Sequence, residues 1–160
     1  MDAPLLGTEA VFAAHQENAA VKALSALAAD AKFDRNELTI TIARENIVAA
    51  ATAVQQAGYN FLEDVTAVDW YPSEPRFQVT YHILSMTLKE RIRLAVRLHG
   101  EDAALDSITG VWPSANFYER EVFDLFGVRF AGHPNLTRIM MPTDWNGHPL
   151  RKDYPVEGYR

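Results

Sequence analysis

The sequence contains no cysteine among its 160 residues. This absence excludes disulfides, thiolate metal sites, cysteine-ligated iron–sulfur clusters and cysteine nucleophiles, and it fits a reducing compartment. No apolar run approaches the ~18 residues expected of a membrane-spanning helix. The opening MDAPLLGTEA is acidic rather than basic, and no apolar stretch follows it. We therefore expect no signal peptide and a cytoplasmic chain.

Basic charge is also scarce, because 15 Lys and Arg stand against 21 Asp and Glu, for a net charge of −6. That balance argues against a broad nucleic-acid footprint. The charge is unevenly placed: residues 1–127 carry −8 and residues 128–160 carry +2. The chain contains no GxGxxG, GxxxxGK[ST] or GxSxG motif, so neither nucleotide cradling nor a serine-nucleophile elbow is encoded.

The length predicts a single domain with a real core, since 48% of the residues are hydrophobic. Hydrophobic periodicity divides most of the chain into helices and strands. We expect Gly58 to end the second helix in a left-handed conformation and Gly127 to end the third. The helices are predicted over 9–29, 45–57 and 114–127, and the strands over 37–43, 61–70, 77–86 and 91–98.

The strand at 91–98 alternates cleanly, with aliphatic residues on one face and arginines on the other. Such alternation is typical of an antiparallel meander with one packed face and one wet face. We therefore predict an α+β fold, in which a mainly antiparallel sheet packs with helices on one face and is followed by a long extended C-terminal arm. The preferred interpretation is that the arginines of this strand form a solvent-exposed face of the sheet, and the alternative is that they bind an acidic partner. They are Arg91, Arg93 and Arg97.

Residues 128–160 form the predicted arm, and residues 1–127 the α+β domain. The arm holds four of the eight prolines, and only residues 136–141 suit a short extended segment. Long stretches without regular structure inside a compact domain usually mean function or disorder. The arm is too rich in apolar residues for disorder. We expect it to become ordered by lying on another surface.

The helix at 114–127 offers several polar interpretations. Ser114 or Asn116 can cap its N-terminus, and Asn116 at the N-cap would place Glu119 at the N3 position of a capping-box-like pair. Arg120 and Asp124 have the spacing of a surface ion pair. Glu119 and Glu121 are two residues apart and do not face each other, so structural or interfacial use is favoured over acid–base catalysis.

A metal site is the competing interpretation of the arm. His133 and His148, with Asp144 and Asp153 nearby, supply ligand types for zinc or ferrous iron. Their spacing matches no helical metal motif, and each histidine precedes a proline, which favours extended backbone. Hydrogen bonding along an extended arm is the preferred interpretation. A stand-alone metal-dependent hydrolase remains the alternative.

Three segments resemble a known family: EREVFDLFG (119–127), GHPNLTRIM (132–140) and PTDWNGHPLRKDYP (142–155). Together they are similar to the C subunit, or 30 kDa-type subunit, of proton-translocating NADH:quinone oxidoreductase, which is respiratory complex I. The resemblance covers about the last third of the chain. One departure is Thr137, where the family favours a basic residue or proline before the arginine kept here as Arg138.

The resemblance implies a non-redox scaffold of the hydrophilic arm that binds the large quinone-site subunit, known as the D subunit. It implies no catalytic residue, metal or cofactor on this chain, because FMN and the iron–sulfur clusters belong to other subunits. The location would be peripheral, on the cytoplasmic side of the bacterial inner membrane, through the complex. The alternative is that the chain is the equivalent subunit of a membrane-bound hydrogenase-type ion-pumping complex.

Twelve residues are candidates for partner binding. We expect Arg138 and Arg151 to be charged anchors, because arginine forks pair with carboxylates and are enriched in interface hot spots. Trp145 is the expected apolar anchor. The full set is Glu119, Arg120, Glu121, Asp124, His133, Arg138, Trp145, His148, Arg151, Lys152, Asp153 and Tyr154.

Overall fold

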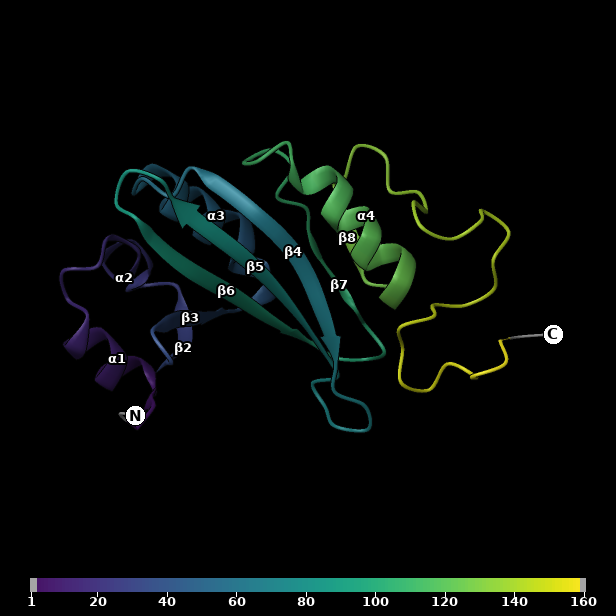
Figure 1. Cartoon of the computed structure of the whole chain (residues 1–160), viewed down its shortest axis with the longest axis horizontal. Helices are drawn as coiled ribbons and strands as arrows, with labels where there is room; N and C mark the ends of the chain where they lie inside the picture. The colour runs from purple at the N-terminus through teal and green to yellow at the C-terminus, as the bar shows by residue number, and fades with distance from the viewer. Residues whose placement is uncertain (1–2, 159–160) are drawn as a thin grey trace.

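A computed structural model describes residues 3–158 of the chain (Figure 1). Its elements follow one another as β1 (Leu5–Leu6), α1 (Thr8–Ala14), α2 (Ala19–Leu24), β2 (Ala28–Asp34), β3 (Glu37–Ile42), the 3₁₀ helix η1 (Arg44–Asn46), α3 (Ile47–Gln56), β4 (Phe61–Asp69), β5 (Phe77–Ser85), β6 (Glu90–Leu98), β7 (Ala104–Asp106), α4 (Ala115–Phe126) and β8 (Arg129–Ala131).

Six strands form one sheet in the order β1-β2-β3-β6-β5-β4, and β7 and β8 form a second, parallel pair. Within the large sheet β3 and β6 are parallel, and the other neighbours are antiparallel. The α+β class and the antiparallel meander of β4, β5 and β6 are confirmed. The sheet as a whole is mixed, because α3 and the β4–β5 hairpin intervene before the chain returns beside β3 in the same direction.

The N-terminal prediction of one long helix over 9–29 is wrong. Asn18 begins a new helix, because its side-chain oxygen accepts hydrogen bonds from the backbone N–H groups of Ala20 and Val21. The end of the predicted helix is instead strand β2. Arg35 and Asn36 both have positive φ, of 51° and 63°, as a tight hairpin between β2 and β3 requires.

The two faces of β6 behave as the alternation predicts. Its aliphatic positions, of which Leu94 is 0% exposed, join the core together with buried residues of α2, α3 and α4. On the opposite face Arg91 pairs with Glu63 at 3.1 Å, and Arg93 pairs with Glu37 at 2.8 Å. These two arginines are therefore matched by carboxylates of their own sheet.

The helix α4 packs along β4, and the arm follows it in the sequence. It ends at Gly127 as the sequence predicted, and the φ of 74° at this residue makes a left-handed cap. Val128 and Phe130 are still buried in the core. From residue 132 to 158 the chain contains neither helix nor strand. The division of the chain at residue 127 stays a prediction.

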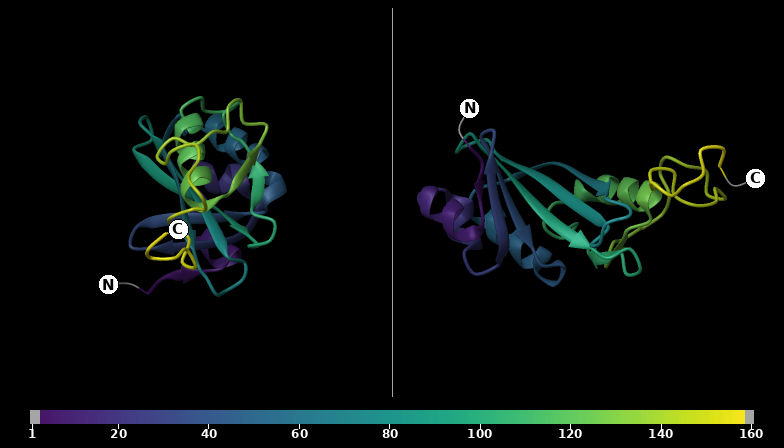
Figure 2. Two further views of the ribbon diagram at one scale, coloured as in Figure 1. Left: turned by 90° about the vertical axis from the view of Figure 1, so that its right-hand side faces the viewer. Right: turned by 90° about the horizontal axis from the view of Figure 1, so that it is seen from below.

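The arm and the N-terminal helices α1 and α2 lie at opposite ends of the long axis (Figures 1 and 2). The arm curves around the C-terminal end of α4 and continues past it as an irregular loop. Within residues 3–158, no helix has the length and apolar character needed to cross a bilayer.

Candidate interaction site

Asp124 is the point at which the arm is attached to α4. Its side chain is 0% exposed. One oxygen accepts a hydrogen bond of 2.6 Å from the guanidinium of Arg138. The other accepts from the backbone N–H groups of Ile139, Met140 and Met141, at 3.0, 2.7 and 2.8 Å. Burial alone would raise the pKa of Asp124, but these donors together hold it below its ordinary value.

The predicted Arg120–Asp124 surface pair is therefore wrong. Asp124 faces inward and binds Arg138, a partner fourteen residues away that the i,i+4 rule does not consider. Arg120 instead reaches the arm, where it donates to the carbonyl and hydroxyl of Thr137, at 3.0 and 3.1 Å, and to the carbonyl of Arg138 at 3.2 Å. Arg120 and Asp124, one turn apart on α4, thus both bind the arm segment 137–141.

The segment GHPLRKDYP caps the C-terminal end of α4. A helix leaves its last carbonyl groups without intrahelical donors. Here the carbonyl of Asp124 lies 2.8 Å from Nδ1 of His148, and that of Leu125 accepts from the backbone N–H of Leu150 at 3.0 Å. The carbonyl of Phe126 accepts from Nε of Arg151 at 2.6 Å. The arginine also places positive charge at the negative end of the helix dipole.

Close packing of this cap explains why a glycine ends α4. A Cβ atom at Gly127 would lie 2.5 Å from the Arg151 guanidinium and 2.6 Å from the ring of His148. The same burial lowers the pKa of His148, despite the opposing effect of the Asp124 carbonyl. A neutral imidazole suits this position, because one ring nitrogen is already used as a donor to the helix end.

The far end of the arm is fastened to the base of the β4–β5 hairpin. Arg76 donates two hydrogen bonds to the buried carboxylate of Asp69, at 2.9 and 2.8 Å. The same guanidinium donates two more to Asp153, at 3.0 and 2.6 Å. Asp69 also accepts from the backbone N–H of Lys152 at 2.8 Å. One arginine thus joins the body to the arm, which is ordered on its own domain, whereas we expected from the sequence that another surface would order it.

Asp69 and Arg76 were absent from the sequence-predicted site. A carboxylate at the end of a strand and an arginine after a proline-rich turn carry no local signal of their role. Their arm partners are 77 or more residues away. The inward-facing place of Asp69 in the alternation of β4 was the one available clue, because a buried charge needs a partner.

Glu119 is also buried, with an exposed fraction of 0%. It accepts hydrogen bonds from Oγ of Ser107 at 2.6 Å and from the backbone N–H of Ile108 at 2.8 Å. Of the two predicted N-cap residues, Ser114 occupies the N-cap position, although its side chain makes no capping hydrogen bond. The capping box that Asn116 would have formed is therefore wrong. Glu119 therefore faces the 107–108 loop instead of the start of its own helix.

The two arm histidines are hydrogen-bonding side chains. Nε2 of His133 lies 3.1 Å from the Asn116 carbonyl, and Nδ1 accepts from the backbone N–H of Asn135 at 3.0 Å. His148 binds the end of α4, as described above. Across residues 3–158 no three His, Cys, Asp or Glu residues gather in a way that could hold a metal ion.

The remaining predicted residues lie at or near the surface of α4 and the arm. Glu121 and Lys152 are exposed, and Tyr154 is half-buried, with its hydroxyl 3.5 Å from the Asn146 carbonyl. Trp145 is 40% exposed. Other large apolar side chains on these two elements are also open to solvent; they are Phe117, Ile139, Met140, Leu150 and Val156.

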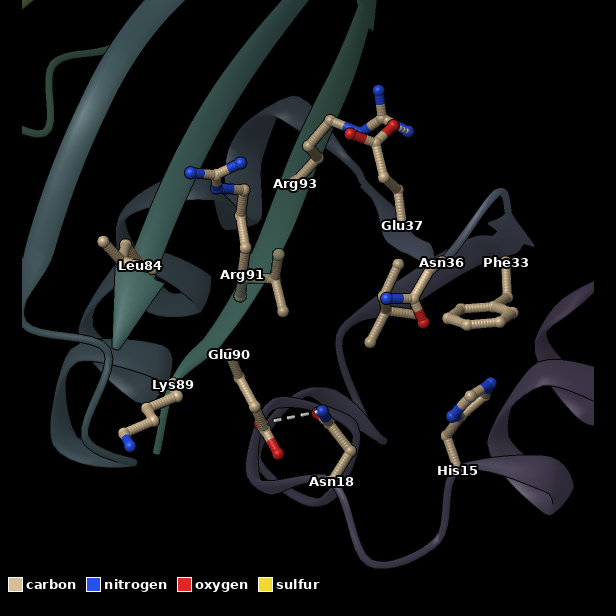
Figure 3. A pocket seen from close by; sticks show the side chains of 12 residues that line it. His15, Asn18, Phe33, Asn36, Glu37, Leu84, Lys89, Glu90, Arg91 and Arg93 are labelled. Carbon is tan, nitrogen blue, oxygen red and sulfur yellow. Dashed lines mark hydrogen bonds and ion pairs between the residues drawn. The ribbon is translucent and has the colours of Figure 1, made fainter. Parts of the chain in front are cut away.

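An open polar groove lies at the other end of the molecule (Figure 3). His15 and Asn18 line it from the N-terminal helices, and Arg91 lines it from β6. Glu90 accepts from Asn18 at 3.0 Å and from the Tyr59 hydroxyl at 2.6 Å, so this carboxylate joins the helices to the sheet. None of the predicted site residues lines the groove.

These features define a class of protein: an α+β domain whose last helix, α4, holds a C-terminal extension by hydrogen bonds and ion pairs. Residues 40–160 match the family described as respiratory-chain NADH dehydrogenase, 30 Kd subunit. The chain belongs to this family, which comprises the C subunits of NADH-quinone oxidoreductase, a complex of the electron transport chain.

Relatives of known name support the assignment over most of the chain. The C subunit of the NADH-quinone oxidoreductase of Citrifermentans bemidjiense is 47% identical over 148 residues, covering 89% of this chain and 92% of that protein. Its counterpart from Geobacter sulfurreducens is 47% identical over 131 residues, covering 81% of both. The lack of cysteine agrees with a subunit that holds no cysteine-ligated cluster.

Two solved structures share the fold. A trypsin-resistant fragment of Nqo5 is 36% identical with a TM-score of 0.59, covering 62% of this chain and 83% of that one. A chain of the membrane-bound sulfane sulfur reductase, an archaeal respiratory membrane complex, is 25% identical with a TM-score of 0.69. That match covers 84% of this chain and 82% of the other.

Proposed function

We propose that this chain is a non-redox scaffold that binds the quinone-site subunit of its complex through the C-terminal arm. Exposed apolar side chains on an internally fastened arm support this role. Met140 is 62% exposed although its own backbone N–H binds Asp124. Ordering a segment before binding reduces the entropy cost of association.

The charged residues divide into two groups with different tasks. Asp124, Arg138 and Arg151 contact their own chain and shape the arm, so we no longer assign the two arginines the role of partner anchors that the sequence suggested. The contact with the quinone-site subunit then falls to apolar side chains, with Trp145 near the centre, since aromatic residues are enriched among interface hot spots. The acidic Glu121 and basic Lys152 would lie at the rim, where charge steers association more than it strengthens it.

Electrons would pass from NADH to quinone through FMN and iron–sulfur clusters held by other subunits, coupled to proton translocation. The role of this chain would be to hold the quinone-site subunit in register within the hydrophilic arm. This role would put the chain on the cytoplasmic side of the bacterial inner membrane, attached through its neighbours.

Binding of the purified quinone-site subunit to immobilised variants of this chain tests the proposal. We expect Trp145→Ala and Met140→Ala each to weaken the affinity by ten-fold or more, as loss of a central apolar anchor does. Met86→Ala is a matched control, because Met86 is 66% exposed and follows β5, away from the arm. Equal affinities for all three variants would refute docking through the arm.

A further inference from the structure

Glu119 is a buried carboxylate at the junction of α4 and the arm, and no lysine or arginine within residues 3–158 lies in ion-pairing range of it. Both oxygens of Glu119 are used, one by a hydroxyl and one by a backbone N–H. The side chain in ion-pairing range is His133, whose Nε2 lies 4.0 Å from Oε2. Because the Asn135 N–H donates to Nδ1, the ring proton is on Nε2, and the imidazole is neutral in this arrangement.

Two hydroxyls connect this carboxylate to the surface. Oγ of Ser107 lies 2.6 Å from Oε2 of Glu119 and 2.9 Å from Oγ1 of Thr109. Both hydroxyl residues are partly exposed, whereas Glu119 is fully buried. A hydroxyl can donate and accept at once, so the series can run in either direction. It therefore suits the movement of one proton between solvent and the interior.

A further buried polar group lies on β5 of the sheet. The hydroxyl of Tyr81, on β5, has no hydrogen-bond partner among the described residues. Burial raises the pKa of Tyr81, and the negative charge of Glu119 raises it further. Apart from the hydrogen bonds from Ser107 and Ile108, this buried carboxylate has no lysine or arginine within ion-pairing range among residues 3–158 to stabilise its charge.

We propose that Glu119 is a proton-binding site, filled and emptied through Ser107 and Thr109, which links the solution pH to the start of the arm. With the proton bound, Oε2–H donates to Ser107, and Ser107 donates to Thr109. When the proton leaves, both hydroxyls reverse, so that Thr109 donates to Ser107 and Ser107 donates to the carboxylate.

The ionised carboxylate also competes for the proton on Nε2 of His133. In the structure that N–H faces the Asn116 carbonyl at 3.1 Å, with the carboxylate at 4.0 Å. A full negative charge is the stronger acceptor. Turning the ring toward Glu119 moves Nδ1 away from the Asn135 N–H. The turn at 133–135 would then open when Glu119 loses its proton.

Carbon-13 NMR of the glutamate carboxyls of the full chain tests the site, with Glu119→Gln used to assign the signal. The expected Glu119 titration has its midpoint at about pH 7. Infrared difference spectra should show the carbonyl band of a protonated acid that Glu119→Gln removes. Glu121→Gln is the matched control, because Glu121 is exposed on the same helix. A Glu119 signal that titrates together with that of Glu121 would overturn the proposal.

Hydrogen exchange at the Asn135 amide tests the link to the arm. We compare protection factors, because these already correct for the effect of pH on the intrinsic exchange rate. We expect the Asn135 protection factor to fall several-fold across the Glu119 titration in the wild type and to stay constant in Glu119→Gln. Should that variant fail to fold, Thr109→Val keeps the carboxylate and removes the outer hydroxyl. This variant should slow proton exchange at Glu119, and an unchanged rate would exclude Thr109 from the route.

Discussion

Arg76 and Asp153, 77 residues apart in the sequence, form a doubly hydrogen-bonded ion pair at 3.0 and 2.6 Å. The pair fixes the far end of the arm to the hairpin that follows β4. The near end is fixed by Asp124 and Arg138. Between these two attachments, Trp145 is presented to solvent on a loop whose ends are both held.

Removing Arg76 should release the far end of the arm and destabilise the fold. In Arg76→Ala the Asp69 carboxylate, 0% exposed, loses its cation, and breaking such a buried pair costs about 3–5 kcal/mol. Asp153→Asn is the matched variant: Asp153 is 43% exposed, so about 1 kcal/mol or less is expected. Urea denaturation measures both free energies of unfolding, and equal losses would contradict the distinction.

Replacing Asp124 should loosen the near end of the arm. Asp124→Asn removes the charge that binds Arg138. It also replaces one accepting oxygen with an NH₂ group that would face N–H donors, and we expect a cost of about 3 kcal/mol. Hydrogen exchange should show faster exchange at the amides of Ile139, Met140 and Met141, all three of which donate to Asp124. Asp144→Asn, at an exposed site on the arm, is the control.

The same carboxylate gives the arm an acid-sensitive attachment. The pKa of Asp124 is held below its ordinary value in the fold. Its stabilising contribution is therefore complete above the unfolded-state pKa of about 4 and is lost as the pH falls toward the folded-state value. Unfolding measured between about pH 5 and 2 should show a smaller loss of stability in Asp124→Asn than in the wild type. A loss of equal size would count against this attachment.

Gly127→Ala should disrupt the helix cap. An added methyl group would meet both Arg151 and His148, and alanine at a φ of 74° is strained by about 1–2 kcal/mol before that clash. Gly110→Ala is a clean control, because a Cβ there meets nothing within 4 Å. Thermal unfolding should separate the two variants by several degrees.

Burial of Glu119 should make the folded protein less stable as the pH rises. Its pKa is raised by burial to about 7, so the folded state holds a proton that the unfolded state releases near pH 4.5. This contribution is complete below the unfolded-state value and is lost as the pH rises through the folded-state one, about 3 kcal/mol in all. In Glu119→Gln the corresponding decline should be absent from pH-dependent urea denaturation.

The periodic segments of the chain were predictable because local patterning is strong there. Strands β3 to β6 and helix α4 follow from alternation or helical spacing, and the end of α4 follows from the glycine at position 127. The N-terminal helix prediction failed because alanine-rich segments favour helix locally. Pairing with β1 and β3 made residues 28–34 a strand, which takes in the last two residues of the predicted helix.

The partners of the polar residues were harder to predict, because sequence spacing does not show which way a side chain faces. Asp124 and Arg120 are four residues apart on one helix, and this predicted a mutual pair. Helix α4 packs against β4 so that Asp124 is buried while Arg120 reaches Thr137. The predicted set therefore included residues of the arm attachment but paired them incorrectly.

By itself the sequence determined that this chain has no cysteine chemistry, that it forms an α+β domain and that its last third carries the family signature. Composition, periodicity and motif identity are local properties, so they can be read directly. Tertiary structure alone decided that Arg76 joins Asp69 to Asp153 and that the arm caps α4. Those contacts depend on burial and on the meeting of distant segments, because a buried charge is stable only where the fold supplies its partner.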